Sequence, residues 1–385
     1  MTSKEIISLF KGIGIIIDEN INNTKSHDDI LKIYKYFIQK QIPVLTYSSL
    51  PEDGVIQNFR DVNFIVLDWN LHNQNPIPLA LIDENLHFIE MVNQVCFTPI
   101  FIFTNEDPHA IEMILQERGL FFADRPNNIF VKSKSEIRSG RILFSEIAKW
   151  VKRTPPVYVM KQWDCNTRKA TSDLFHDLHK ISPDWAYILV KTYNEDVGAE
   201  NTEIGNLLFS NLMTTCAPLI LDNQIIHKTR NKVNKEELRH LLEREKYIDN
   251  SKLMKYPALG DIFKDGKNYY FNFRPDCDLV RQDNPEIYLV KGKIIKEKDI
   301  IKRNSYYKFH KGTFLDRVDS SVVPFIDNGK MVVFEFKKLK CAFWEDYADK
   351  RIGRLLPPYS LRLKSQLMGY VQRQALPSIP EIAIK

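Results

Sequence analysis

The sequence predicts an α/β domain with a doubly wound parallel sheet, followed by a helical region and a β-rich region with a C-terminal helix. Three observations predict this order. In the first 150 residues, short apolar runs alternate with amphipathic segments, which is typical of strands and helices around a parallel sheet. From 157 to 250, apolar residues recur at helical spacing. From about 255, alternating apolar runs are separated by turn residues. The predicted parts are 1–153, 154–250 and 251–385.

Five strands are predicted in the first part, and all are short and largely apolar. They are GIGIIID (12–18), IPVLTYS (42–48), NFIVLD (63–68), TPIFIFT (98–104) and NIFVK (128–132). Strands that are apolar at successive positions are buried on both faces, as in parallel sheets covered by helices. The amphipathic segments that separate or follow them are predicted helices at 26–41, 78–95, 107–119 and 139–153.

The remaining elements follow from the change of pattern along the chain. The segment RTPPVY (153–158) is interpreted as a boundary, and helices are predicted at 163–180, 183–194, 202–215 and 234–248. Strands are predicted at 268–273 and 286–292 and in the run 320–338. In that run, Asp327-Asn328-Gly329 between two apolar stretches is a strong hairpin signal. Residues 351–374 are predicted to form a closing helix entered through LPPY.

Charge is distributed unevenly along the chain. The net charge is +5 overall, but it is −5 for residues 1–150, zero for 151–250 and +10 for 251–385. This asymmetry indicates different partners at the two ends. No apolar run is long enough to span a bilayer, and the five cysteines are scattered without a CxxC pair. A cytoplasmic protein with reduced thiols and no membrane contact is therefore expected.

Polar residues end the predicted parallel strands. Asp18 and Glu19 follow the first strand, Asp68 the third, Thr104 the fourth and Lys132 the fifth. The carboxyl ends of such strands share one edge of the sheet, where sites are built. Clustered carboxylates repel one another unless a cation lies among them, and Mg²⁺ prefers oxygen ligands. An Asp in this setting can act as a nucleophile toward a phosphoryl group, with Lys132 and Thr104 as contacts.

The motifs IIIDEN, FIVLDWNL, IFIFTNED and IFVKSK, in that order, resemble the receiver domain of bacterial response regulators over residues 13 to about 150. The resemblance implies a flavodoxin-like fold with Asp68 as the phosphoacceptor. It implies that Mg²⁺ is held by Asp18, Glu19, Asp68 and the backbone carbonyl of Asn70. Thr104 is then the switch hydroxyl and Lys132 the phosphate-contacting lysine. Enzymatic activity is expected only for phosphorylation and dephosphorylation of the chain itself.

Three departures from the receiver pattern leave an alternative open. Ser133 stands where receivers usually have Pro, Ile129 stands where they usually have an aromatic residue, and the stretch 72–97 is longer than usual. These features bear on the loop geometry, the switch and the partner surface. The alternative is a scaffold that docks without being phosphorylated.

The whole layout also looks like receiver-containing proteins of bacterial conflict and antiviral (anti-phage) gene clusters. That likeness implies a two-component-type signalling protein whose partner is a histidine kinase or an ATPase of the GHKL/Hsp90 type. The helical middle is expected to transmit the signal or to form a homodimer.

The basic C-terminal part offers two further hypotheses. Glu335 and Lys337 in VVFEFKK resemble the ExK pair of Mg²⁺-dependent nucleases, with Asp327 as the upstream acid; the alternative is a hairpin with a solvent-facing ion pair. Arg354 and Arg362 belong to a basic stretch interleaved with tyrosines, which could bind nucleic acid. An acidic protein face or solvent could equally face that stretch.

Overall fold

A computed structural model describes residues 3–22, 29–137, 139–196, 200–227, 234–279, 284–296, 315–317 and 319–373. The contacts divide the chain into two compact units. The N-terminal unit is Met1–Leu178 with Ser210–Thr229, and the C-terminal unit is His179–Phe209 with Arg230–Lys385. The sequence predicted three consecutive parts, whereas each unit here combines two separate stretches of chain. Among the described residues, no helix has the length and apolar character needed to cross a membrane.

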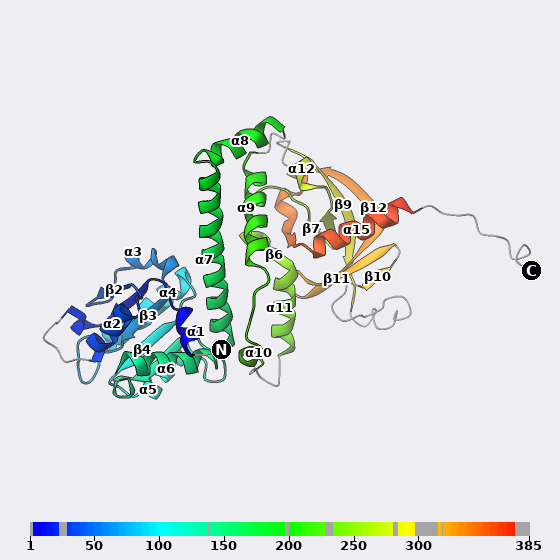
Figure 1. Cartoon of the computed structure of the whole chain (residues 1–385). Helices are drawn as coiled ribbons and strands as arrows, with labels where there is room; N and C mark the ends of the chain where they lie inside the picture. The colour runs from blue at the N-terminus through cyan, green and yellow to red at the C-terminus, as the bar shows by residue number, and fades with distance from the viewer. Residues whose placement is uncertain are drawn as a thin grey trace, which may run out of the picture. The chain divides into compact units, whose positions relative to one another are not determined.

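The N-terminal unit contains the predicted five-stranded parallel sheet, which Figure 1 shows surrounded by helices. Its strand order is β2-β1-β3-β4-β5. All of its neighbouring strands pair in parallel. Strands β1, β3 and β4 are buried at every position, as their continuous apolar runs predicted. The strands are β1 (Gly14–Ile17), β2 (Val44–Tyr47), β3 (Phe64–Asp68), β4 (Ile100–Thr104) and β5 (Ile129–Ser133).

Helices cover both faces of this sheet, so the doubly wound prediction is confirmed. One core includes Ile16, Phe64 and Phe101 from the strands and packs them against one set of helices. The opposite core includes Ile15, Ile65 and the other set. The first set is α1 (Ser3–Ser8), α2 (Asp29–Gln39), α6 (Gly140–Val151) and the start of α7 (Pro155–Ile181); the second is α3 (Asp53–Ile56), α4 (Leu79–Val95) and α5 (Pro108–Glu117).

Helix α7 begins where the sequence predicted a boundary. Pro155 is its first residue, a position that proline favours because the first helical N–H has no partner within the helix. The helix is fixed to the N-terminal unit by Lys161, whose Nζ is buried and donates to the Asn63 carbonyl at 2.5 Å. Arg168 donates to the Asp61 carbonyl at 3.2 Å. The other helices of the middle region are α8 (Trp185–Asp196), α9 (Glu200–Cys216), α10 (Asn223–Ile226) and α11 (Lys235–Lys246).

The C-terminal unit is built on an eight-stranded antiparallel sheet with the order β10-β11-β12-β9-β8-β7-β13-β6. Its strands are β6 (Tyr247–Asp249), β7 (Asp261–Asp265), β8 (Asn268–Asn272), β9 (Glu286–Ile294), β10 (Leu315–Arg317), β11 (Ser320–Ile326), β12 (Lys330–Phe343) and β13 (Arg351–Leu355). The short helices α12 (Asp276–Leu279) and α14 (Trp344–Tyr347) lie between strands, and α15 (Tyr359–Gln372) closes the described chain.

The predicted hairpin is confirmed between β11 and β12. Its turn residues Asp327, Asn328 and Gly329 have positive φ angles of 47°, 63° and 74°, which Asn, Asp and Gly tolerate best. The Glu243 carboxylate of α11 accepts the backbone N–H groups of Asn328 and Gly329 at 3.0 and 2.7 Å. The turn is therefore held against α11.

The predicted closing helix is correct only from LPPY onward. Residues 351–355 form the strand β13, which pairs with β6 and β7, and α15 starts at Tyr359. The reason is local: Ile352 and the small Gly353 allow close strand pairing, because a Cβ at Gly353 would lie 2.3 Å from the Ile248 carbonyl. Leu363 and Leu367 of α15 pack on the core of the sheet.

Candidate functional site

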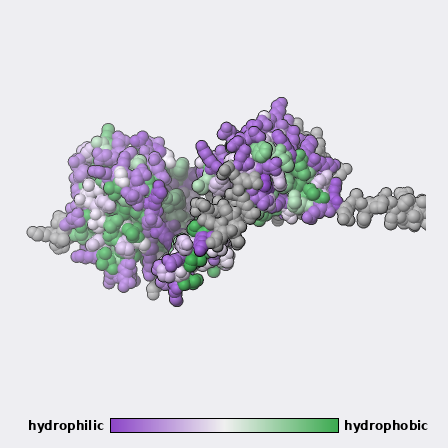
Figure 2. Space-filling model, turned by 90° about the horizontal axis from the view of Figure 1, so that it is seen from above, coloured by the Kyte–Doolittle hydropathy of each residue, from purple (hydrophilic) through white to green (hydrophobic). Residues whose placement is uncertain are grey.

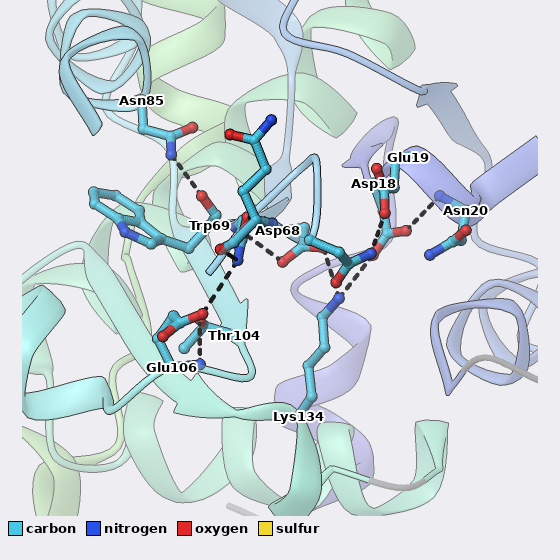
Figure 3. A network of polar contacts seen from close by, with 12 residues as sticks. Asp18, Glu19, Asn20, Asp68, Trp69, Asn85, Thr104, Glu106 and Lys134 are labelled. Atoms are coloured by element: carbon cyan, nitrogen blue, oxygen red, sulfur yellow. Dashed lines mark hydrogen bonds and ion pairs between the residues drawn. The ribbon is translucent and has the colours of Figure 1, made fainter. Parts of the chain in front are cut away.

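Asp68 is the last residue of β3, next to β1 and β4 in the sheet, and only 3% of it is exposed. Its carboxylate lies close to a lysine and to a second carboxylate. The Lys134 ammonium lies 2.7 Å from Asp68 Oδ2 and 3.2 Å from Asp18 Oδ2 (Figure 3). One cation therefore joins two buried carboxylates at the carboxyl edge of the sheet.

Asp18 directly follows β1 and is 1% exposed. Its backbone N–H donates to the Tyr47 carbonyl at 3.0 Å, which fixes the strand end beside β2. Its other carboxylate oxygen, Oδ1, accepts the Asn20 N–H at 2.9 Å. The side chain is thus held by a local turn on one side and by Lys134 on the other.

The lysine that contacts Asp68 is Lys134, two residues beyond the predicted Lys132. Lys132 lies 2.5 Å from Glu136 and 4.0 Å from Glu146, and it makes no described contact with Asp68. The cause is strand alternation, because Lys132 shares a face of β5 with Phe130, which packs against Trp150 of α6. Lys132 therefore points toward α6.

Lys134 reaches the acids because β5 ends one residue earlier. Ser133 is the last strand residue and caps a 3₁₀ turn over Lys134–Glu136, with its hydroxyl accepting the Ser135 N–H at 3.3 Å. That turn redirects the lysine over the edge of the sheet. The signal was present in the sequence, since Ser133 followed three residues later by Glu136 is the pattern of a helical start.

Thr104 ends β4 beside Asp68, and its side chain is fully buried. Its hydroxyl accepts the N–H of Glu106 at 3.0 Å. The Glu106 carboxylate in turn accepts the Asn70 amide at 3.1 Å, and the Asn70 N–H donates to Asp68 Oδ1 at 3.3 Å. Glu106 was not predicted, and it connects the Thr104 strand end to the loop that follows Asp68.

The predicted metal ligands are only partly brought together. Asp18 and Asp68 converge, but Glu19 is hydrogen-bonded to the Asn73 side chain, and the Asn70 carbonyl accepts the Asn73 N–H at 3.1 Å. Within the described ranges, no group of three or more His, Cys, Asp and Glu side chains is arranged to hold a metal ion. Two carboxylates with water can suffice for Mg²⁺. Asp18 and Asp68 fit that set, with Lys134 now occupying the space between them.

A buried amide supports the residue after Asp68. Trp69 is 1% exposed, and its carbonyl accepts the Asn85 amide at 2.7 Å (Figure 3). The second polar atom of Asn85, Oδ1, is buried without a hydrogen bond among the described residues. Asn85 was missed by sequence reasoning because a single Asn inside an amphipathic helix gives no signal of its target. It ties α4 to the end of β3.

Burial and neighbouring opposite charges have opposing effects on the pKa values of Asp68 and Lys134. Burial raises the pKa of Asp68 from 3.8 to about 7; the Lys134 cation works against this rise, and the Asp18 charge adds to it. The pKa of Lys134 is raised, because the attraction of the two carboxylates outweighs the effect of its own burial. The lysine therefore remains protonated, while Asp68 is poised between its neutral and charged forms near neutral pH.

The C-terminal candidates do not assemble into one site. Glu335 pairs with Lys293 at 2.9 Å and Lys338 at 2.5 Å, and Lys337 pairs separately with Asp319 at 3.6 Å. The expected upstream acid, Asp327, accepts hydrogen bonds in its turn from Tyr269 at 2.6 Å, Lys330 at 2.9 Å and Lys264 at 3.2 Å.

The two predicted arginines differ in environment. Arg354 Nε lies 2.7 Å from the fully buried Asp261, whose Oδ2 is 3.5 Å from Arg351. Arg354 therefore belongs to a buried ion cluster that holds β13 against β7. Arg362 lies on α15 and is exposed. The two arginines that the sequence grouped together therefore have separate roles: Arg354 lies in a buried ion cluster, and Arg362 lies on the surface of α15.

Comparisons with known proteins add little to this geometry. No protein family model matches the chain, and no curated protein matches it. Among solved structures, one described as the yeast Spc42 trimeric coiled-coil, amino acids 181–211, fused to another structure is similar with 13% identity and a TM-score of 0.24. That likeness covers 36% of this chain and 76% of the other.

Proposed function

We propose that this chain is a signalling protein of the two-component type, in which Asp68 accepts a phosphoryl group in a receiver-like, flavodoxin-like domain. The observation that carries the proposal is the contact of Lys134 with both Asp68 and Asp18 at one strand edge. A nucleophilic carboxylate, a second acid and a cation are together there, and the Thr104 hydroxyl lies at the neighbouring strand end. The strand order and the sequence motifs support the same reading.

The reaction needs little covalent machinery from the protein. An Asp68 oxygen attacks the phosphorus of a phosphohistidine or a small phosphodonor, an acyl phosphate forms, and the bond from phosphorus to the leaving group breaks. The Asp68 carboxylate loses its charge when the acyl phosphate forms. Lys134 can then pair with the oxygens of the new phosphoryl group. The Thr104 hydroxyl is free to donate a proton to such an oxygen, since its contact with Glu106 uses it as an acceptor.

Magnesium is part of this proposal. Asp18 and Asp68 would hold it, and when bound it would neutralise charge on the transferring phosphoryl oxygens. The ammonium of Lys134 lies between the same two carboxylates, so Lys134 must move aside for the ion. We therefore expect Mg²⁺ affinity to rise in Lys134→Met and to fall in Asp18→Ala.

The proposal is tested with beryllofluoride or acetyl phosphate and Mg²⁺ on the full chain. Mass spectrometry should find one phosphoryl group on Asp68, and tryptophan emission should change because Trp69 is adjacent and buried. Asp68→Asn should abolish both signals. Asp61→Asn is the matched control, because that carboxylate is exposed and lies before β3. An unresponsive wild type, or a response that survives in Asp68→Asn, rules out phosphorylation at this site.

A non-phosphorylated scaffold is the second candidate, and one observation favours it. Lys134 already satisfies both carboxylates, and Glu19 is engaged by Asn73. In a scaffold this ion cluster would only hold β1, β3 and the turn after β5 together. The same experiment separates the two. A receiver-gated nuclease is not favoured, because Glu335, Lys337 and Asp327 each pair with a different residue.

For a phosphorylated protein, the partner would be a histidine kinase or a GHKL/Hsp90-type ATPase, and a role in antiviral defence rests on the layout of the sequence alone. The output would lie in the C-terminal unit. Comparing binding of a candidate ATPase to the wild-type chain with and without beryllofluoride would test this step.

A further inference from the structure

We propose that the second half of strand β12 is a pairing edge for a second copy of this chain, with the two strands antiparallel about a twofold axis at Cys341. The edge comprises residues 339–343. It does not involve the Asp68 site, so the proposal stands or falls independently of phosphorylation.

The geometry of β12 exposes this edge. Its first half pairs with both β11 and β9, up to Phe336, whose N–H donates to the Asp319 carbonyl at 2.9 Å. The register with β9 then shifts between Phe334 and Leu339. Beyond the shift, β12 pairs only with β9 among the described strands, because β11 begins at Ser320.

The backbone groups that face the open side can be identified. Trp344 donates its N–H to the Pro285 carbonyl, so even-numbered residues here bond to β9. In an antiparallel pair, alternate residues direct both backbone groups to opposite edges. Leu339, Cys341 and Phe343 therefore direct their N–H and C=O groups outward. An open edge of this kind is a template for another strand.

The side chains on this edge are unusually apolar for a solvated strand. Leu339 and Phe343 are each 49% exposed, and Cys341 between them is also exposed. The three share one face of the sheet with their cross-strand neighbours in β9, which are Val290, Tyr288 and Glu286 respectively. Hydrophobic residues are visible on the surface of the C-terminal unit in Figure 2. Exposed apolar residues beside backbone that no other described strand pairs with indicate an interaction surface.

The sequence of the edge is complementary to itself. Antiparallel pairing centred on Cys341 sets Leu339 opposite Phe343 of the second copy, in both directions. It sets Lys340 opposite Ala342, so no lysine faces a lysine. At each end it sets Lys337 of one copy opposite Glu345 of the other, at the start of α14. Apolar pairs at the centre and opposite charges at the ends favour this register.

The charges are available for such an exchange. Lys337 and Lys338 pair within the chain with Asp319 and Glu335, but both lysines are more than half exposed. Exposed ion pairs contribute little, so their rearrangement costs little. Lysines often protect an edge from pairing. Here they stand at the end of the edge where the second copy presents acids, and so they select one register rather than prevent pairing.

The test uses the full chain in a Cys277→Ser background, which removes the other exposed cysteine. Sedimentation should show a concentration-dependent dimer, because a five-residue edge is smaller than a standard stable interface. Mild oxidation should link Cys341 to Cys341 of the second copy. A hydrogen-bonded antiparallel pair sets the Cα atoms about 5.5 Å apart, within disulfide range.

The variant that tests the surface is Leu339→Lys with Phe343→Lys. It should raise the dissociation constant of the dimer at least about tenfold, since two central apolar contacts are lost. Leu361→Lys is the control, because Leu361 is 51% exposed on α15 and lies outside the edge. Unchanged thermal unfolding of the double variant shows that it folds.

Three results would overturn the proposal. The first is a monomer at all concentrations without oxidative linkage through Cys341. The second is a dimer that the double variant leaves unchanged. The third is a monomer whose Cys341 resists alkylation, because another segment of the same chain then covers the edge.

Discussion

At the scale of single residues, two lysines near the end of β5 lie only two residues apart but have different contacts. Lys132 lies on the face of β5 that packs against α6, and Lys134 lies in the turn that follows. The first is held by glutamates and the second by the two buried aspartates. The turn, rather than the strand, therefore determines which lysine belongs to the site.

This difference gives a matched pair of variants. Lys134→Met should slow phosphorylation of Asp68 by small phosphodonors about 100-fold, because it removes the cation aimed at the transferring group. Lys132→Met should change the rate less than about threefold, since its contacts are with Glu136 and Glu146. The rates are measured by incorporation from labelled acetyl phosphate. Equal losses in the two variants would contradict the assignment of Lys134.

The raised pKa of Asp68 predicts a pH dependence with a definite sign. Only the carboxylate is a nucleophile, and burial holds the pKa of Asp68 near 7. Without added Mg²⁺, which would itself favour the carboxylate, the rate with a small phosphodonor should therefore rise between pH 6 and 8 and level off above the pKa, as the carboxylate fraction approaches one. In Lys134→Met the midpoint should move to higher pH, because the cation that favours the carboxylate is gone. A flat profile after correction for the donor would contradict the raised pKa.

At the scale of elements, the sequence predicted the strands and helices of the N-terminal sheet because each has a clear period. Runs such as Phe64–Asp68 are too apolar for a solvated strand, and they are buried at every position. Asp18, Asp68 and Thr104 could be placed at strand ends for the same reason. The orientation of the fifth-strand lysine could not, because it depends on where β5 stops and the 3₁₀ turn begins.

The strand β13 was harder to predict. RIGRL combines two arginines with Ile, Gly and Leu and has no clear strand alternation, and the following LPPY marked only the start of α15. Its arginines looked like a surface charge run until Asp261 of β7, about ninety residues earlier, was found beside them. Sequence periodicity cannot report a buried ion pair between distant strands, because each charge alone reads as solvated.

That cluster predicts a stability difference between two arginines. Arg354→Ala should lower the free energy of unfolding by about 3 kcal/mol, because it leaves the buried Asp261 carboxylate poorly compensated. Arg362→Ala, on the exposed part of α15, should change it by less than about 0.5 kcal/mol. Denaturant unfolding of the full chain measures both. A similar small change in the two variants would mean that the buried pair does not support the C-terminal unit.

At the scale of the whole molecule, the N-terminal unit draws on a returning segment. Ile225 is 3% exposed in its core, and the Asp222 N–H donates to the hydroxyl of Tyr158 on α7 at 2.9 Å. Asp222 and Ile225 belong to the second stretch of this unit, Ser210–Thr229. No sequence pattern indicated this return, because its short helix α10 carries only two apolar residues.

A truncation series tests the return. A fragment ending at 229 should unfold at a temperature several degrees above one ending at 178, because the shorter fragment exposes the part of the core that Ile225 covers. Ile225→Ala in the longer fragment should lose much of that difference. Calorimetry or circular dichroism measures the midpoints. Equal midpoints for the two fragments would show that the returning segment does not stabilise the unit.

The return also bears on how the protein is made. A chain leaving the ribosome delivers the five parallel strands and α7 first. Ile225, which is buried in the same unit, emerges only after α8 and α9. Until then the part of the core that Ile225 covers stays exposed in the nascent N-terminal unit. Maturation of the Asp68 domain is thereby tied to synthesis of the segment that leads into the C-terminal unit.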